Sequence, residues 1–150
     1  MKGDIIEKAS HHAVSLTPQQ ATLACLYVLA ACDGVPSSEE LALIDALAAS
    51  AASLAYMAAT DRAASLALAR DLADAPDGLE TLLDLCAQAL KNGRDGQIAY
   101  AQAVEFVVCH GQVSPEEMHL LDLIANRLSV DRLTRAAIEA AARLRQARFS

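Results

Sequence analysis

Two clusters of acidic residues are the most site-like chemistry in this chain. Each cluster surrounds a glycine, where an apolar segment gives way to a second amphipathic one. Carboxylate oxygens are the ligands that hard cations such as Ca²⁺ and Mg²⁺ prefer, and nearby histidines would shift the preference toward zinc. The sequence therefore offers a candidate site for a divalent metal ion (Ca, Mg or Zn). The candidate ligands are Asp33, Glu39, Glu40, His110, Glu116 and Glu117.

The two clusters belong to an internal repeat. Residues 32–48 read CDGVPSSEELALIDALA and residues 109–125 read CHGQVSPEEMHLLDLIA, and a constant offset of 77 aligns them without a gap. The pattern predicts two helix–turn–helix units, at about 20–50 and 97–128, related by a pseudo-two-fold axis. Repetition places the clusters at equivalent points of the fold.

The same acids have a purely structural interpretation. Ser37 with Glu40, and Ser114 with Glu117, have the spacing of a capping box, in which serine and glutamate satisfy each other's backbone N–H groups. Acids in a first helical turn also complement the helix dipole. If a metal is bound in the first turn, Asp33 with Glu40 is a better ligand pair than Glu39 with Asp45. The latter two project about 120° apart on one helix.

Catalysis has little support. The upstream positions that an EF-hand needs are filled by Leu29 and Ala31, which excludes that loop. Cys109 and His110 are sequence neighbours, so on a helix their side chains diverge by about 100°. A metalloenzyme using His110, Glu116 and His119 is a third alternative, and we expect no enzyme.

Composition predicts an all-α protein. The chain of 150 residues is 54% hydrophobic but only 3% aromatic, so its apolar mass is mainly the helix formers Ala and Leu. We expect one domain over 1–150, a bundle of seven to eight helices. Helices are expected at about 4–15, 18–32, 38–50, 62–73, 78–91, 97–109, 115–128 and 132–148. Asp61 and Asp77 are expected to cap the fourth and fifth of these. The last helix carries an apolar stripe: Leu133, Ala137, Ala140, Ala141 and Leu144.

Charge divides the chain in two. Residues 1–126 carry 17 acidic and 6 basic residues, whereas residues 127–150 carry 2 acidic and 6 basic ones. The acidic body argues against nucleic-acid binding. The basic end either forms a solvated helix face or binds a partner through Arg132, Arg135 and Arg143.

The cysteines and the apolar segments indicate the cellular compartment in which the protein is expected. The four cysteines lie in apolar helical patterns, which is typical of buried free thiols in a reducing environment. A pair between Cys32 and Cys109 is the alternative. Only 21–32 is continuously apolar, too short for a membrane span, and no signal peptide opens the chain. We expect a soluble cytoplasmic protein without direct membrane insertion.

The segments DGVPSSEE and HGQVSPEE, each after an apolar helix, resemble the TerB-like family of tellurite-resistance proteins. A similar domain type occurs in a membrane-anchored co-chaperone. The resemblance covers roughly 20–145, and His110 stands where the family pattern has aspartate. The first copy matches at Ala30, Ala31, Asp33, Gly34 and Glu40, and the second at Gly111 and Glu117.

The resemblance implies an all-helical, non-enzymatic stress-response protein linked to resistance to tellurium oxyanions, phage and colicins. It also implies a metal-ion site at the acidic motif residues and a membrane partner of the TerC type. The expected function is thus an interaction module that binds an ion at its acidic turns. The alternative is a structural protein–protein interaction scaffold in which the acids only cap helices.

Overall fold

Seven helices make up the described part of the computed structural model, which covers residues 14–109, 111 and 113–150. They are α2 (Pro18–Ala30), α3 (Ser38–Ser50), α4 (Ala59–Asp74), α5 (Gly78–Ala89), α6 (Gly93–Cys109), α7 (Pro115–Arg127) and α8 (Arg132–Gln146). These residues contain no strand, so the all-α prediction is confirmed. The helix predicted at 4–15 lies outside the described residues except for Val14 and Ser15, which are not helical.

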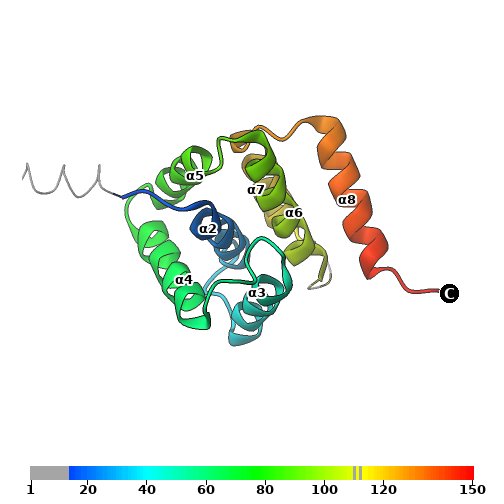
Figure 1. Cartoon of the computed structure of the whole chain (residues 1–150), viewed down its shortest axis with the longest axis horizontal. Coiled ribbons are helices and arrows are strands. Elements are labelled where there is room, and N and C mark those ends of the chain that lie inside the picture. The colour runs from blue at the N-terminus through cyan, green and yellow to red at the C-terminus, as the bar shows by residue number, and fades with distance from the viewer. Residues whose placement is uncertain (1–13, 110, 112) are drawn as a thin grey trace, which may run out of the picture.

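Helix α2 is the centre of the bundle. Every residue from Ala21 to Ala30 is buried, and α2 contacts α3, α4, α5, α6 and α7, which surround it in Figure 1. This agrees with a helix that is apolar almost all round. Leu23, Leu26 and Leu29 are nearly inaccessible, and each contributes roughly 1.5–3 kcal/mol by burial.

Helix α6 provides the other half of the core. Its inward side carries Tyr100, Val104 and Phe106, which are all fully or nearly fully buried. Helices α2 and α6 pack against each other, and α3, α7 and α8 lie around them (Figure 1). Among the described helices, none is both long and apolar enough to cross a membrane.

Two helix starts and one helix cap differ from the sequence prediction. Helix α4 begins at Ala59, so Asp61 lies inside its first turn, and Ala58 provides no side-chain cap. Asp77 precedes α5 but has a left-handed backbone (φ 54°) and makes no capping hydrogen bond. Helix α6 begins at Gly93 rather than near 97, because Asn92 Oδ1 accepts a hydrogen bond from the Arg94 N–H (3.1 Å) at its first turn.

The apolar stripe of α8 lies mostly on the outside of the bundle. Leu133 and Leu144 are 82% and 76% exposed, and Ala137 and Ala140 are exposed as well. The side that packs on α6 instead carries Ile138 and the buried Ala142, flanked by charged side chains. The side of α8 toward the bundle can carry charges because they are ion-paired with α6 and α7.

Candidate functional site

The first acidic turn joins α2 to α3. Gly34 has a φ of 142°, a conformation that favours glycine. The Ser37 hydroxyl accepts a hydrogen bond from the Glu40 N–H (3.1 Å), and Glu40 Oε1 accepts one from the Ser37 N–H (3.0 Å). The predicted capping box is confirmed, and one carboxylate oxygen of Glu40 is committed to it.

The second acidic turn repeats this arrangement between α6 and α7. Gly111 has a φ of 110°. Ser114 Oγ accepts from the Glu117 N–H (3.1 Å), and Glu117 Oε1 accepts from the Ser114 N–H (3.3 Å). Glu117 is only 5% exposed, whereas Glu40 is half-buried. Both predicted glutamate caps are therefore present, and the second is the more enclosed.

The remaining metal candidates are dispersed over the surface of the turns. Asp33, Glu39 and Glu116 are exposed, and His110 lies outside the described residues. Within the described ranges, no three His, Cys, Asp or Glu side chains come together in a way that could hold a metal ion. The geometry assigns Glu40 and Glu117 to helix capping.

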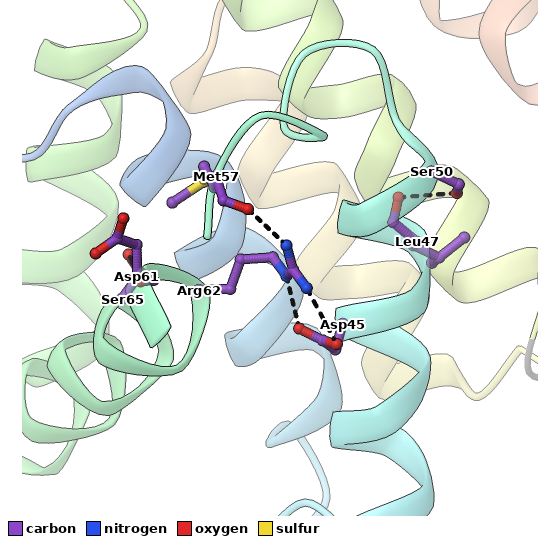
Figure 2. A network of polar contacts seen from close by, with 7 residues as sticks. All are labelled: Asp45, Leu47, Ser50, Met57, Asp61, Arg62 and Ser65. Atoms are coloured by element: carbon purple, nitrogen blue, oxygen red, sulfur yellow. Dashed lines mark hydrogen bonds and ion pairs between the residues drawn. The ribbon is translucent and has the colours of Figure 1, made fainter. Parts of the chain in front are cut away.

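Asp45 of the first cluster binds an arginine instead of an ion. Figure 2 shows Arg62 of α4 between Asp45 and the loop that precedes α4. Arg62 Nε donates to Asp45 Oδ1 (2.7 Å), and Arg62 Nη1 donates to the Met57 carbonyl (2.7 Å). Arg62 is 9% exposed, and the bond to Asp45 raises its pKa. This contact fixes the long connection between α3 and α4.

Asp122 of α7 also binds an arginine. Arg135 of α8 pairs with Asp122 and lies over the Tyr100 ring, 5.6 Å from its centroid. The Tyr100 hydroxyl donates to Glu139 Oε1 (2.9 Å). Burial is the main cause that raises the pKa of Tyr100 to about 12, and the hydrogen bond to Glu139 is the second. Charged groups thus fasten α8 to α6 and α7.

An apolar cavity lies beside the acidic turns. It has a volume of about 460 Å³ and is lined by residues of α2, α4, α5 and α7, including Leu79, Leu120 and Leu123. Cys32, Glu116 and His119 also line it. Sequence reasoning did not bring Cys32 and His119 together, because the cavity joins the turn after α2 in one repeat unit to α7 in the other and leaves no periodic signal.

The thiol in this cavity is held protonated. Burial raises the pKa of Cys32 to about 11, and the charges of Asp33, Glu117 and Glu116 contribute to the rise. A thiol with a raised pKa is a weak nucleophile at neutral pH. The negative charges that would attract a cation thus disfavour thiolate chemistry at Cys32.

All four cysteines are free thiols. Cys32 lies near Asp33 and Glu116, whereas Cys109 lies near Glu105 and Arg145, so the two have different surroundings. Cys25 and Cys86 are buried, and the Cys86 thiol donates to the Ala21 carbonyl (3.5 Å).

The three candidate partner-binding arginines have different environments. Arg135 is turned inward, as described above, whereas Arg132 and Arg143 are exposed on α8. Neither Arg132 nor Arg143 forms an ion pair with a described residue. Arg132 and Arg143 are the two that remain available to a partner.

Comparison with protein-family models, curated proteins and solved structures gives no match. The TerB-like resemblance therefore rests on the sequence motifs.

Proposed function

We propose that this chain is a non-enzymatic protein-interaction module of the stress-response type, with a TerB-like, pseudo-two-fold architecture. The observation that carries the proposal is the capping role of Glu40 and Glu117. Each places one carboxylate oxygen on the backbone N–H of its own helix start. That geometry favours helix caps over a symmetric pair of ion sites. The protonated Cys32 thiol is also consistent with a role in binding rather than in reaction.

The repeat supports the architectural part of the proposal. Both turns have a positive-φ glycine and a Ser–Glu capping box, and both are followed by an Asp–Arg pair at Asp45 and Asp122. Cytoplasmic location, a TerC-type membrane partner and protection against tellurium oxyanions come from the family resemblance, and they belong to this proposal.

An ion-dependent module is the second candidate. Asp33, Glu39 and Glu116 are exposed, and their carboxylates form no ion pair with a described residue. Exposed carboxylates at a turn suit Ca²⁺ or Mg²⁺. In this version Asp33 would be the principal ligand in the first turn.

Metal content and titration distinguish the two candidates. The purified, untagged protein is analysed for metal, then titrated with Ca²⁺, Mg²⁺, Mn²⁺ and Zn²⁺ while its melting temperature is followed. Asp33→Asn and Glu40→Gln are compared with the control variant Asp71→Asn, which replaces an exposed carboxylate of α4. We expect no stoichiometric ion. Glu40→Gln should change stability only slightly, because glutamine can complete a capping box.

A stoichiometric ion that Asp33→Asn abolishes and Asp71→Asn retains would contradict the scaffold and establish the ion-dependent module. The stress-response part is tested separately by deleting the gene in its host. Loss of tellurite tolerance that the wild-type gene restores would support it, and unchanged tolerance would contradict it.

A further inference from the structure

Helices α4 and α8 occupy equivalent places after the two repeated turns. Arg62 is the fourth residue of α4 and Arg135 is the fourth residue of α8. Each pairs with the aspartate of the preceding helix, and those aspartates, Asp45 and Asp122, are at the same position of the 77-residue repeat. An offset of 73 therefore aligns α4 with α8.

The inward faces of the two helices correspond under this alignment. Arg62 and Ala69 of α4 are buried, and the matching Arg135 and Ala142 of α8 are half-buried and buried. The same side of each helix therefore packs on the bundle, so the opposite sides can be compared residue by residue.

The outward faces differ in chemistry. On α4 the exposed positions Thr60 and Asp71 are polar, as expected for a face in water. The matching positions on α8 are Leu133 and Leu144, which are 82% and 76% exposed. Between them lie the exposed Ala137 and Ala140, as Ala64 and Ala67 do on α4. The leucines distinguish α8 from a helix whose outer face is only solvated.

Four exposed residues form the α8 stripe: Leu133, Ala137, Ala140 and Leu144. Their spacing is that of the residues that one helix contributes to the contact between two packed helices. Steps of four, three and four residues keep the four side chains on one line of a helix. The alanines in the middle would let a second helix approach closely. No described helix other than α6 packs extensively on α8, and Figure 1 shows α8 at the edge of the molecule.

The charge beside the stripe indicates the partner. Arg132 and Arg143 are eleven residues apart, about three turns, so they lie on one flank of the stripe. Neither has an ion-pair partner among the described residues. A second copy packed antiparallel on the same stripe would bring Arg132 near the partner's own basic end, where like charges repel. An acidic helix would instead be attracted.

We propose that the outward face of α8 docks an acidic amphipathic helix of a partner protein. Leu133 and Leu144 enter the apolar seam of that helix, and Arg132 and Arg143 pair with carboxylates along its flank. This inference rests on the proposed function as an interaction module and specifies its surface. The contact of a single helix is small, so the complex is expected to be weak and reversible.

A synthetic helix tests the proposal directly. The probe is a fluorescein-labelled peptide of three heptads with Leu at the a and d positions and Glu at e and g, where the glutamates oppose self-association. The comparison peptide has Lys in place of Glu. Fluorescence anisotropy with the full chain should show binding of the acidic peptide, weakened by added salt, and little binding of the basic one.

The variants use the residues of α4 as a template. Leu133→Thr with Leu144→Asp gives α8 the outer residues of α4 and should leave the melting temperature nearly unchanged while raising Kd by about tenfold or more. Arg132→Glu with Arg143→Glu should also weaken binding. Arg70→Glu, at the α4 position that matches Arg143, is the control and should bind as the wild type does.

Three results would overturn the proposal. The first is failure of the acidic peptide to bind, or binding that the α8 variants leave unchanged. The second is a wild-type dimer in sedimentation velocity that Leu133→Thr with Leu144→Asp makes monomeric, since the occupant would then be a second copy. The third is binding to phosphatidylserine-containing vesicles, lost in the same variants, with none to the peptide. None of these three results changes the expected outcome of the metal titration. A failure of the proposed docking surface can therefore be distinguished from a failure of the proposed scaffold function.

Discussion

The halves α2–α4 and α6–α8 share their local chemistry but differ in how their third helix is covered. Helix α4 packs on α2 and α5, whereas the extensive contact of α8 is with α6 alone among the described helices (Figure 1). The Asp–Arg pair is correspondingly more enclosed in the first half, where the Arg62 side chain is 10% exposed against 23% for Arg135. The same type of ion pair thus lies in a more enclosed environment in the first half, whereas in the second half it attaches a helix at the edge of the bundle.

The difference shows which local features the two halves have in common and which they do not. Glycine turns and capping boxes depend on residues close in sequence, and both halves keep them. Both halves also keep an Asp–Arg pair between their second and third helices. The outer face of the third helix depends on its surroundings. With α8 at the edge of the bundle, its outer leucines are not needed for the fold and are available for docking.

The largest predicted effect tests whether the two halves share one core. Leu29 of α2 and Phe106 of α6 are at the same position of the repeat, and both are almost inaccessible. Leu29→Ala should lower the free energy of unfolding by about 2–5 kcal/mol and Phe106→Ala by about 3–5 kcal/mol, because each leaves a cavity. Urea unfolding followed by circular dichroism measures both.

Leu133→Ala is the control for these two variants. Its side chain is exposed on α8, so its effect should stay within about 0.5 kcal/mol. If Phe106→Ala proved as mild as Leu133→Ala, the second half would contribute little to the common core, and the comparison would fail.

An intermediate effect is expected at the two arginines. Arg62→Ala removes hydrogen bonds to Asp45 and to the Met57 carbonyl, so it should loosen the connection before α4. Arg135→Ala removes the pair with Asp122 and the contact with Tyr100, at a more exposed site. The shift of the urea midpoint should be about twice as large for Arg62→Ala, because truncation there leaves the part-buried Met57 carbonyl without its donor.

Aspartate variants test whether the contact with the Met57 carbonyl, and not the ion pair alone, causes the larger effect of Arg62→Ala. Asp45→Ala and Asp122→Ala remove only the carboxylates, which are half exposed or more, so their effects should be small and similar. A loss for Arg135→Ala equal to that for Arg62→Ala would show that enclosure of the pair has no energetic consequence.

Local signals in the sequence predicted the helices well. Ser37 and Ser114 begin helices where their capping boxes indicated. Thr17 forms a third capping box at the start of α2, and Asp131 caps α8. Asp61 and Asp77 misled because a capping residue needs an extended backbone as well as a suitable side chain. Asp77 is left-handed, and the start of α4 is set three residues earlier by the preceding loop.

Contacts between distant segments were harder to anticipate. The outward direction of Leu133 follows from ion pairs of α8 with Asp122 and Glu105, which hold charged residues on the inner side. The cavity at Cys32 joins α2 to α7, and no periodicity relates them. Capping by Glu40 and Glu117 was one of two readings of the acidic turns, and only hydrogen-bond geometry could favour it.

The smallest predicted effect concerns the reactivity of matched cysteines. Cys32 and Cys109 are equivalent in the repeat, but the carboxylates of Asp33, Glu117 and Glu116 help to raise the pKa of Cys32 to about 11. Because the thiolate is the reactive form, alkylation of Cys32 by iodoacetamide should be slow at pH 8 and should accelerate as pH rises toward 11. Mass spectrometry of the peptides reports each site separately.

Replacing one carboxylate tests the cause of the shift. Asp33→Asn removes a negative charge beside Cys32, so the pKa should fall and alkylation at pH 8 should quicken. Cys109, whose neighbours are Glu105 and Arg145, should react as before. The direction of the pH dependence of stability also follows. In the folded state the Cys32 thiol keeps its proton above the ordinary thiol pKa of 9.0, so Cys32 makes folding less favourable as pH rises above 9.0. No acceleration at Cys32 would place the origin of the shift in burial alone, and equal acceleration at both cysteines would indicate a general loosening of the fold.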